Sequence, residues 1–395
     1  MNIPRFLCAV LAAVAFQAAW AGSVAPPDGK TTANADAASS AQPKTDSAED
    51  VEDPAYAAEG EHLGEAAGAH MIGQPAPPVA VTTIDGEKID LGALYGKKPV
   101  YLKFWATWCV PCRQQMPGFE KIYESLGDKI QIIAVDIGLS DDEASVRAYR
   151  KKFGLRMPIV IDDGLLGALF NLRVTPQHVV IGRGGRFEYM GHLADQRVDM
   201  ALQKSLAEPA STPSAVGRLA TNKPAFKVGD VIRGLDATTT TGSHVSLGRR
   251  RDQRLLGLVF FSTWCESYLE TSRPKTSKAC QRDRVEVDRL AHDAGVSWLG
   301  IAGGLWSTAE NLKEYQSTTK IKIPLALDQS GSLFRSFGVR DIPTIALIDS
   351  SGRVVRVLGP DDADISGAIR AARAAPSAGG SRSTVGRALV RSGLQ

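Results

Sequence analysis

The feature that most constrains the fold of this chain is an internal repeat. Gly229 stands 36 residues before Cys265, just as Gly73 stands 36 residues before Cys109, and the tripeptide Thr-Trp-Cys ends both intervals. Self-similarity in a fixed register indicates two copies of one structural unit. A chain of 395 residues has room for two ordinary domains with additional segments.

The first copy carries a Cys-x-x-Cys motif directly after an apolar run. Residues 104–112 read FWATWCVPC, a pattern typical of a buried strand that leads into a helix. A cysteine at the start of a helix lies near unpaired N–H groups at the positive end of the helix dipole, which favours the thiolate. We therefore expect Cys109 to be the attacking sulfur. Cys112, one turn further on, would resolve a mixed disulfide.

The segment FWATWCVPCRQQMP resembles the active site of TlpA/ResA-type thiol–disulfide oxidoreductases, a branch of the thioredoxin superfamily. The resemblance rests on the aromatic strand, Trp108, the two cysteines and the helix proline Pro117. It covers residues 71–207 and 223–375. It implies an α/β chain with two tandem thioredoxin-like folds, each a central mixed sheet flanked by helices, with the dithiol at the carboxyl end of a central strand.

In this family a cis proline lies against the dithiol, and its neighbours bind the substrate backbone. Val-Thr175-Pro176 is followed by an apolar strand and a Gly-Gly-Arg turn, so Pro176 is the candidate. A cis peptide bond is plausible essentially only before proline. The resemblance thus implies that Trp108, Thr175 and Pro176 bind substrate. Pro343 is the counterpart of Pro176 in the second copy.

Hydrophobic periodicity in the first copy predicts an alternation of strands and helices around the motif. The predicted strands are 79–84, 88–91, 99–105, 130–136, 157–161, 177–181 and 186–190, and the predicted helices are 112–125, 141–153, 165–170 and 197–206. Asp85-Gly86 between the first two strands indicates a hairpin.

The repeat and the resemblance delimit the two domains, and composition and residue patterns assign the other segments. The expected boundaries are a signal peptide at 1–21, a disordered acidic tether at 22–70, a redox-active domain at 71–207, a linker at 208–222, a degenerate domain at 223–375 and a disordered tail at 376–395. Arg5, the apolar run after it and an Ala-Trp-Ala site are typical of a cleavable secretory signal, with an uncleaved anchor as the alternative. The tether has hardly any large apolar side chains, although residues 50–56 could alternatively dock a partner.

A signal peptide would place the mature protein in an oxidising compartment, most simply the bacterial periplasm. The formal net charge of +3 supports no nucleic-acid interaction, and the sequence implies no cofactor. By resemblance, the protein reduces disulfide-bearing proteins for cytochrome c maturation or copper-site assembly, with a membrane thiol transporter of the DsbD/CcdA type as electron donor. A disulfide oxidase or isomerase with the same dithiol is the alternative.

The second copy keeps Cys265 but has Tyr268 where the second cysteine would stand. Three interpretations remain open: a structural disulfide between Cys265 and Cys280, a redox-active pair of the same cysteines, or two unpaired thiols. A straight helix would put residues 15 apart at about 22 Å, whereas a disulfide tolerates about 4.4–6.8 Å between α-carbons. A bond therefore requires the chain to fold back, and Pro274 offers the place. We expect this domain to be chiefly a scaffold or binding module.

Two positions depart from the family pattern. Lys103 stands where relatives often carry Asp or Asn, and Gln115 stands where many reductases have a carboxylate. A carboxylate there would take the proton of the resolving thiol, so the proton relay is in doubt. Lys103 could favour the thiolate by its charge, or extend its side chain to the surface.

His178 follows Pro176 by two residues and could face the dithiol. With Cys109 and Cys112 it could then hold Cu(I), which would make the protein a copper chaperone. The alternative is a strand histidine at the domain surface.

Overall fold

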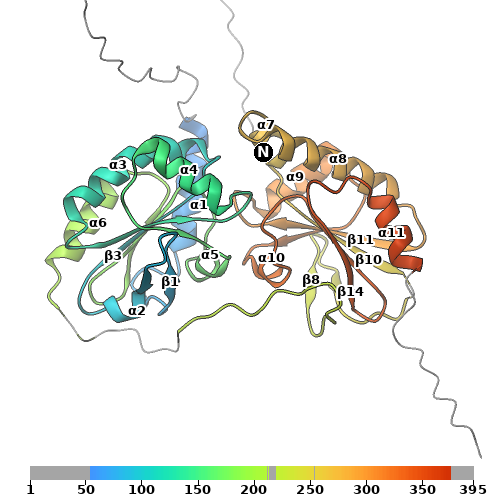
Figure 1. The fold of residues 1–395 in the computed structure, drawn as a ribbon, viewed down its shortest axis with the longest axis horizontal. Helices are drawn as coiled ribbons and strands as arrows, with labels where there is room; N and C mark the ends of the chain where they lie inside the picture. The colour runs from blue at the N-terminus through green and yellow to red at the C-terminus, as the bar shows by residue number, and fades with distance from the viewer. Residues whose placement is uncertain (1–53, 211, 213–218, 253, 375–395) are drawn as a thin grey trace, which may run out of the picture. The chain divides into compact units, whose positions relative to one another are not determined.

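The computed structural model describes residues 54–210, 212, 219–252 and 254–374. The expected signal peptide, the first part of the tether and the C-terminal tail lie outside these residues. Two α/β domains follow one another along the chain, each built on its own five-stranded sheet (Figure 1). No helix within the described ranges combines the length and apolar character needed to cross a bilayer.

The first domain contains six helices and seven strands within the described part of the chain. They are α1 (Pro54–Gly68), β1 (Ala80–Thr82), β2 (Lys88–Asp90), α2 (Leu91–Leu94), β3 (Val100–Trp105), α3 (Val110–Leu126), β4 (Gln131–Asp136), α4 (Glu143–Phe153), β5 (Ile159–Ile161), α5 (Leu165–Leu169), β6 (Gln177–Ile181), β7 (Phe187–Gly191) and α6 (Gln196–Ala207). The sheet order is β5-β4-β3-β6-β7. The strands β3, β4 and β5 are parallel, whereas β6 is antiparallel to both of its neighbours, β3 and β7.

The second domain repeats this topology. Its elements are β8 (Asp236–Thr238), β9 (His244–Ser246), β10 (Leu255–Phe261), α7 (Cys265–Ser272), α8 (Pro274–Leu290), β11 (Val296–Gly303), α9 (Ala309–Thr319), β12 (Leu325–Asp328), α10 (Ser332–Ser336), β13 (Thr344–Ile348), β14 (Val354–Leu358) and α11 (Ile365–Ala374). The order β12-β11-β10-β13-β14, with β13 and β14 antiparallel, matches the first sheet strand for strand.

The repeat predicted from the sequence is confirmed at the level of single contacts. The Arg186 guanidinium donates to the carbonyl of Gly73 at 2.7 Å, and the Arg353 guanidinium donates to the carbonyl of Gly229 at 2.5 Å. Both arginines follow the turn between the last two strands of their sheet. Each therefore fastens the start of its domain to the sheet in the same way.

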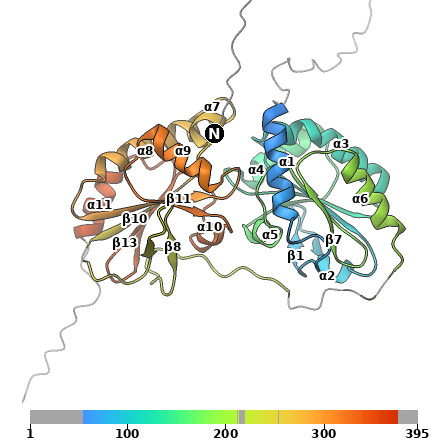
Figure 2. The ribbon, with the colours of Figure 1, turned by 180° about the vertical axis from the view of Figure 1, so that it is seen from behind.

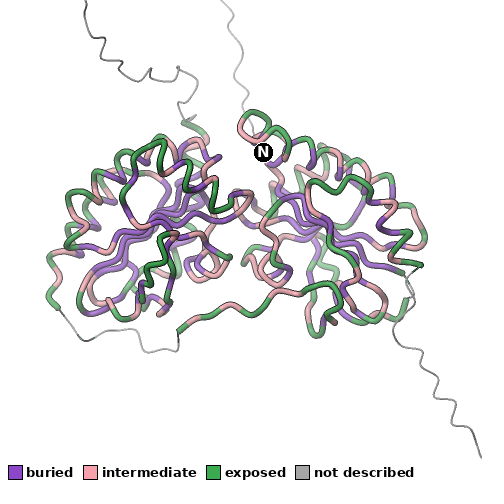
Figure 3. The backbone as a smooth tube through the Cα atoms, viewed as in Figure 1, coloured by how far each residue is buried: buried purple, intermediate pink, exposed green. Residues whose placement is uncertain are grey.

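The central strands β3 and β10 are buried along their whole length, as Figure 3 shows. Helices cover parallel sheets on both faces, so such strands have continuous apolar sequences rather than alternating ones. This explains why the run before each first cysteine is apolar throughout. The carboxyl ends of β3 and β10 lead directly to Cys109 and Cys265.

The expectation of a disordered tether up to residue 70 is wrong from Pro54 onward, because this stretch forms α1. The helix packs along β7 (Figure 2). Gly60, Gly64 and Gly68 share one face and lie close to β7 and the residue after it: a Cβ at Gly64 would lie 2.8 Å from the backbone nitrogen of His192. The helix thus docks by close backbone approach rather than by large apolar side chains, which is why its composition suggested disorder.

Candidate active site

Cys109 and Cys112 form a disulfide at the start of α3, with their α-carbons 5.2 Å apart. Cys109 is the N-cap of the helix: its backbone is extended and its Sγ accepts a hydrogen bond from the backbone nitrogen of Cys112 at 3.2 Å. Pro111 occupies the first turn, where no hydrogen bond is lost. The predicted pairing of these cysteines at a helix N-terminus is confirmed.

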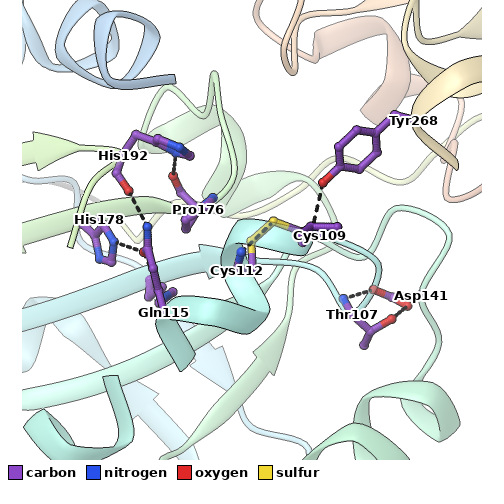
Figure 4. The surroundings of a disulfide bond; sticks show 11 residues. Thr107, Cys109, Cys112, Gln115, Asp141, Pro176, His178, His192 and Tyr268 are labelled. Atoms are coloured by element: carbon purple, nitrogen blue, oxygen red, sulfur yellow. Dashed lines mark hydrogen bonds between the residues drawn. A yellow bond between two sulfur atoms is a disulfide. The ribbon is translucent and has the colours of Figure 1, made fainter. Parts of the chain in front are cut away.

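The peptide bond between Thr175 and Pro176 is cis, as predicted, and so is the bond between Ile342 and Pro343. The carbonyl of Pro176 accepts a hydrogen bond from Nδ1 of His192 at 2.8 Å, within the surroundings of the disulfide drawn in Figure 4. Thr175 is 1% exposed. Both domains therefore place a cis proline at the start of the antiparallel strand next to the central one.

Lys103 lies on β3 and is fully buried, so the alternative in which its side chain extends to the surface is wrong. Its Nζ donates to Oε1 of Gln115 at 3.2 Å and lies 5.6 Å from the centre of the Phe119 ring. Burial holds the pKa of Lys103 well below its ordinary value, because an ammonium group is poorly solvated in an apolar interior. The position where relatives often carry Asp or Asn is thus occupied by an amine whose neutral form is favoured.

Gln115 connects this amine to two histidines. Its Oε1 accepts from Nε2 of His178 at 2.8 Å, and its Nε2 donates to the carbonyl of His192 at 3.3 Å (Figure 4). The Nδ1 of His178 is 2.8 Å from the hydroxyl of Tyr101. Because Nε2 carries the proton donated to Gln115, Nδ1 accepts from Tyr101 in the neutral imidazole.

Both alternatives for His178 are therefore wrong. It is 1% exposed rather than at the surface, and both ring nitrogens are engaged by Tyr101 and Gln115, so neither is directed at the cysteines as a copper ligand. Burial, together with Lys103 and His192, lowers the pKa of His178 well below its ordinary value. Across the described ranges, no group of three or more His, Cys, Asp and Glu side chains is arranged to hold a metal ion.

Asp141 is a site residue that the sequence did not reveal. Its carboxylate accepts from the backbone nitrogen of Thr107 at 2.8 Å, which fixes the turn between β3 and Cys109. The guanidinium of Arg273, in the second domain, donates to the same carboxylate at 2.6 Å and to the Thr107 hydroxyl at 2.7 Å. Burial raises the pKa of Asp141, while the hydrogen bonds from Thr107 and the charge of Arg273 oppose this shift.

Tyr268 is the second residue that the sequence did not reveal as part of this site. Its hydroxyl accepts a hydrogen bond from the backbone nitrogen of Val110 at 3.0 Å, in the first turn of α3 (Figure 4). The rings of Trp108 and Trp264, the residues before the two first cysteines, lie 5.2 Å apart. Cys109 is 1% exposed and Cys112 is fully buried. The second domain thus covers the disulfide of the first.

Cys265 and Cys280 also form a disulfide, with their α-carbons 6.3 Å apart. The chain folds back as expected: α7 ends at Ser272 and α8 begins at Pro274. The interpretation with two unpaired thiols is wrong. The other two interpretations, a structural disulfide and a redox-active one, stay predictions.

Two known families match the two domains separately. The AhpC/TSA family matches residues 72–190, and the Redoxin family matches residues 218–368. Over 133 residues the chain is 35% identical to the thioredoxin-like protein YneN of Bacillus subtilis (strain 168), covering 33% of this chain and 78% of that protein. Over 139 residues it is 33% identical to the thiol-disulfide oxidoreductase ResA of Bacillus anthracis, covering 34% of this chain and 78% of ResA.

A crystal structure of a thiol:disulfide interchange protein from Chlorobium tepidum TLS, described as a thioredoxin family protein, is similar with 23% identity and a TM-score of 0.31. The match covers 34% of this chain and 96% of that one. The identity to YneN and ResA extends over most of each relative. The chain therefore belongs to the thioredoxin-like thiol–disulfide oxidoreductases of the ResA type and contains two thioredoxin-like domains in tandem.

Proposed function

We propose that Cys109 and Cys112 are the catalytic pair of a reductase for disulfides in client proteins. The observation that carries this proposal is the disulfide at the N-terminus of α3, with Cys109 as the helix cap. Unpaired N–H groups and the helix dipole favour a negative charge on this sulfur once the bond is reduced. Cys109 is thus the better nucleophile of the two.

In the proposed reaction the Cys109 thiolate attacks one sulfur of a substrate disulfide and forms a mixed disulfide. The other substrate sulfur leaves as a thiolate and takes a proton. Cys112, once deprotonated, attacks Sγ of Cys109 and releases the second substrate thiol. Two electrons pass to the substrate, and the Cys109–Cys112 bond forms again.

Trp108, Thr175 and Pro176 would form the surface that receives the substrate, by analogy with the family. Trp108 is only 3% exposed and packs against Trp264. Substrate binding to Cys109 therefore requires the contacts around Trp264 and Tyr268 to open. This makes the second domain part of the access route to the dithiol.

The clients we propose are periplasmic proteins with cysteine pairs, such as those of cytochrome c maturation or copper-site assembly. A membrane thiol transporter of the DsbD/CcdA type would supply the electrons. Support comes from the relatives named thiol-disulfide oxidoreductases and from the secretory pattern at the start of the sequence. A reductase needs such a supply because an oxidising compartment otherwise keeps its cysteines paired.

One observation favours an oxidase or isomerase with the same cysteines. Lys103 stands where relatives often carry Asp or Asn, and an amine that takes up a proton on reduction would stabilise thiolates. Stabilising the reduced form raises the reduction potential and makes the disulfide more oxidising.

The reduction potential of Cys109–Cys112 decides between these functions. We would equilibrate the full chain in glutathione buffers and quantify each thiol by mass-spectrometric peptide mapping. A reduction potential of about −270 to −220 mV supports a reductase, whereas a potential of about −120 mV indicates an oxidant. In parallel, reduction of insulin disulfides with dithiothreitol as electron source should be lost in Cys109→Ser.

A further inference from the structure

We propose that Cys265–Cys280 is a second redox-active disulfide and that it exchanges electrons with Cys109–Cys112 of the same chain. This inference rests on the proposed function of the first pair. It assigns a chemical role to the domain whose Cys-x-x-Cys motif is incomplete.

The setting of Cys265 resembles that of Cys109. Cys265 begins α7 shortly after the central strand β10, with Trp264 as the N-cap, whereas Cys109 is itself the N-cap of α3. A cis bond precedes Pro343 as it precedes Pro176. The indole of Trp264 donates to the carbonyl of Leu305 at 2.8 Å, just as the indole of Trp108 donates to the carbonyl of Leu139 at 2.8 Å. The second domain therefore keeps the position of the attacking cysteine and supplies its partner from a different helix.

The surroundings of Cys280 contain groups that can handle a thiol proton. Cys280 and Pro343 line a small cavity of about 20 Å³ together with the acidic side chains Glu266 and Asp283. Arg284 forms an ion pair with Glu266 at 2.6 Å. A carboxylate beside a cysteine can accept its proton and so assist thiol–disulfide exchange. In the first site, Gln115 stands in place of such a carboxylate. The carboxylates that could accept a thiol proton in this way are those of the second domain.

The contacts between the domains bring the two cysteine-bearing helix starts together. Tyr268, in the first turn of α7, accepts from the backbone nitrogen of Val110, in the first turn of α3. The tryptophans that precede Cys109 and Cys265 pack against each other. Arg273, at the break between α7 and α8, bonds to Asp141 and Thr107 beside Cys109.

All four cysteines belong to one continuous cluster of buried apolar residues. Their exposed fractions range from zero to 6%. Burial shields both disulfides from small thiols in solvent but leaves them in one cluster to which both domains contribute. This arrangement favours exchange within the chain over exchange with solvent thiols.

The exchange itself balances without a further reagent. When a protein dithiol has reduced the first pair, the Cys109 thiolate attacks one sulfur of Cys265–Cys280. One cysteine of the second pair leaves as a thiolate and takes a proton. Cys112 then gives up its proton and attacks Sγ of Cys109, which releases the second thiol. Two electrons have moved from Cys109–Cys112 to Cys265–Cys280.

The first test uses the unaltered full chain. We would equilibrate it in dithiothreitol buffers of graded ratio and map the redox state of all four cysteines. We expect the equilibrium constant for electron exchange between the two pairs to lie within 1,000-fold of unity. A tenfold change in this constant corresponds to about 30 mV, so the reduction potentials of the two pairs should differ by at most about 90 mV. A larger difference, with Cys265–Cys280 the more stable bond, overturns the proposal because that bond is then structural.

The second test traps the intermediate. In Cys112→Ser the mixed disulfide can no longer be resolved by Cys112, and only the cysteine freed from the second pair can reverse its formation. We therefore expect a fraction of monomeric chains with a bond from Cys109 to Cys265 or Cys280, preserved by acid quenching and read from non-reducing peptide maps. The double variant Cys109→Ser, Cys112→Ser should show only Cys265–Cys280. A Cys112→Ser chain that keeps Cys265–Cys280 intact beside an unlinked Cys109 contradicts the exchange.

A third measurement separates this inference from the proposed function. The variant Cys265→Ser, Cys280→Ser should still reduce insulin disulfides through the first pair, with its fold checked by circular dichroism. Insulin reduction that survives in Cys109→Ser defeats the proposed function itself. Insulin reduction that needs Cys109, combined with no cross-link in Cys112→Ser, defeats only the exchange between the pairs.

Discussion

Lys103 departs most clearly from the chemistry expected near a dithiol. Its side chain is fully buried, and its amine donates a hydrogen bond to Gln115. Removing this polar group from water lowers the free energy of unfolding. Replacing it with Met keeps the side-chain length and removes that cost. We expect the oxidised Lys103→Met chain to be more stable by about 1–3 kcal/mol at pH 6, the range that mutational data give for the burial of a polar group.

The pH dependence of this gain follows from the lowered pKa of Lys103. Between the folded pKa and the unfolded value of about 10.4, the folded chain binds fewer protons than the unfolded chain. Stability of the wild type therefore rises with pH across that interval. The advantage of Lys103→Met should shrink as the pH approaches 10. Calorimetry at pH 6 and pH 9 measures the stability difference between Lys103→Met and the wild type, with the variant Lys121→Met at an exposed position as control. A difference that is the same at both pH values would contradict the lowered pKa of Lys103.

Asp162 gives the opposite dependence on pH. Burial raises its pKa from 3.8 to about 6, although the backbone nitrogens of Leu166 and Gly167 donate to its carboxylate. Between these values the folded chain binds more protons, so stability falls as the pH rises from about 4 to 6 and then levels off. The shift of about two units corresponds to roughly 3 kcal/mol.

We expect Asp162→Asn to abolish this loss of stability. The free energy of unfolding of the wild type relative to Asp162→Asn should decrease by up to about 3 kcal/mol between pH 4 and pH 7. Denaturant titrations of the oxidised chains at both pH values provide the comparison. The exposed neighbour Asp163 supplies the control: Asp163→Asn should keep the dependence of the wild type, and equal behaviour of both variants would refute the assignment.

At the scale of elements, α1 depends on glycine for its position. A Cβ at Gly64 would lie 2.8 Å from the nitrogen of His192 and 2.9 Å from the carbonyl carbon of Gly191, both backbone atoms that cannot move aside cheaply. Gly64→Ala should therefore destabilise the chain by about 1–3 kcal/mol, even though alanine favours a helix by about 1 kcal/mol. Faster hydrogen exchange of the α1 amides would report the loss of docking.

Gly118 provides a matched control for this substitution. It lies inside α3 with open space where its Cβ would be. Gly118→Ala should therefore stabilise the chain by about 0.5–1 kcal/mol through helix propensity alone. If Gly64→Ala stabilised the chain to the same extent, the close packing of α1 on β7 would not hold in solution.

Much of the first domain was predictable from local sequence. The apolar run before Cys109 identified β3, and the prolines and cysteines after it identified α3, because both signals lie within a short window. The hairpin of β1 and β2 followed from Asp85-Gly86, and Gly86 has the positive φ that such a turn requires. The helix α1 was missed because its three glycines carry no apolar signal, although their spacing of four residues places them on one face.

At the scale of the whole molecule, the cover over the dithiol could not be predicted. In the sequence, Tyr268 indicates only that the second cysteine is missing. Arg273 is only one of several basic residues that follow it. Their partners Val110 and Asp141 are more than 130 residues away in sequence. Such contacts depend on how two folded surfaces meet, which hydrophobic periodicity does not encode. The repeat did, however, align Trp108 with Trp264, the two tryptophans that pack against each other.

This cover should control how fast the Cys109–Cys112 bond is reduced. Tyr268→Phe keeps the ring that packs against Trp108 but removes the hydroxyl that accepts from Val110. A hydrogen bond contributes about 0.5–1.5 kcal/mol net, so the open state should become about 2- to 10-fold more populated. We expect dithiothreitol to reduce the bond faster by this factor, measured by stopping the reaction with a thiol-alkylating reagent.

The control for this variant is Tyr95→Phe, which removes a hydrogen bond to Pro77 at 3.1 Å. If both variants react at the wild-type rate, then the contact with Tyr268 does not limit access of thiols to the Cys109–Cys112 bond.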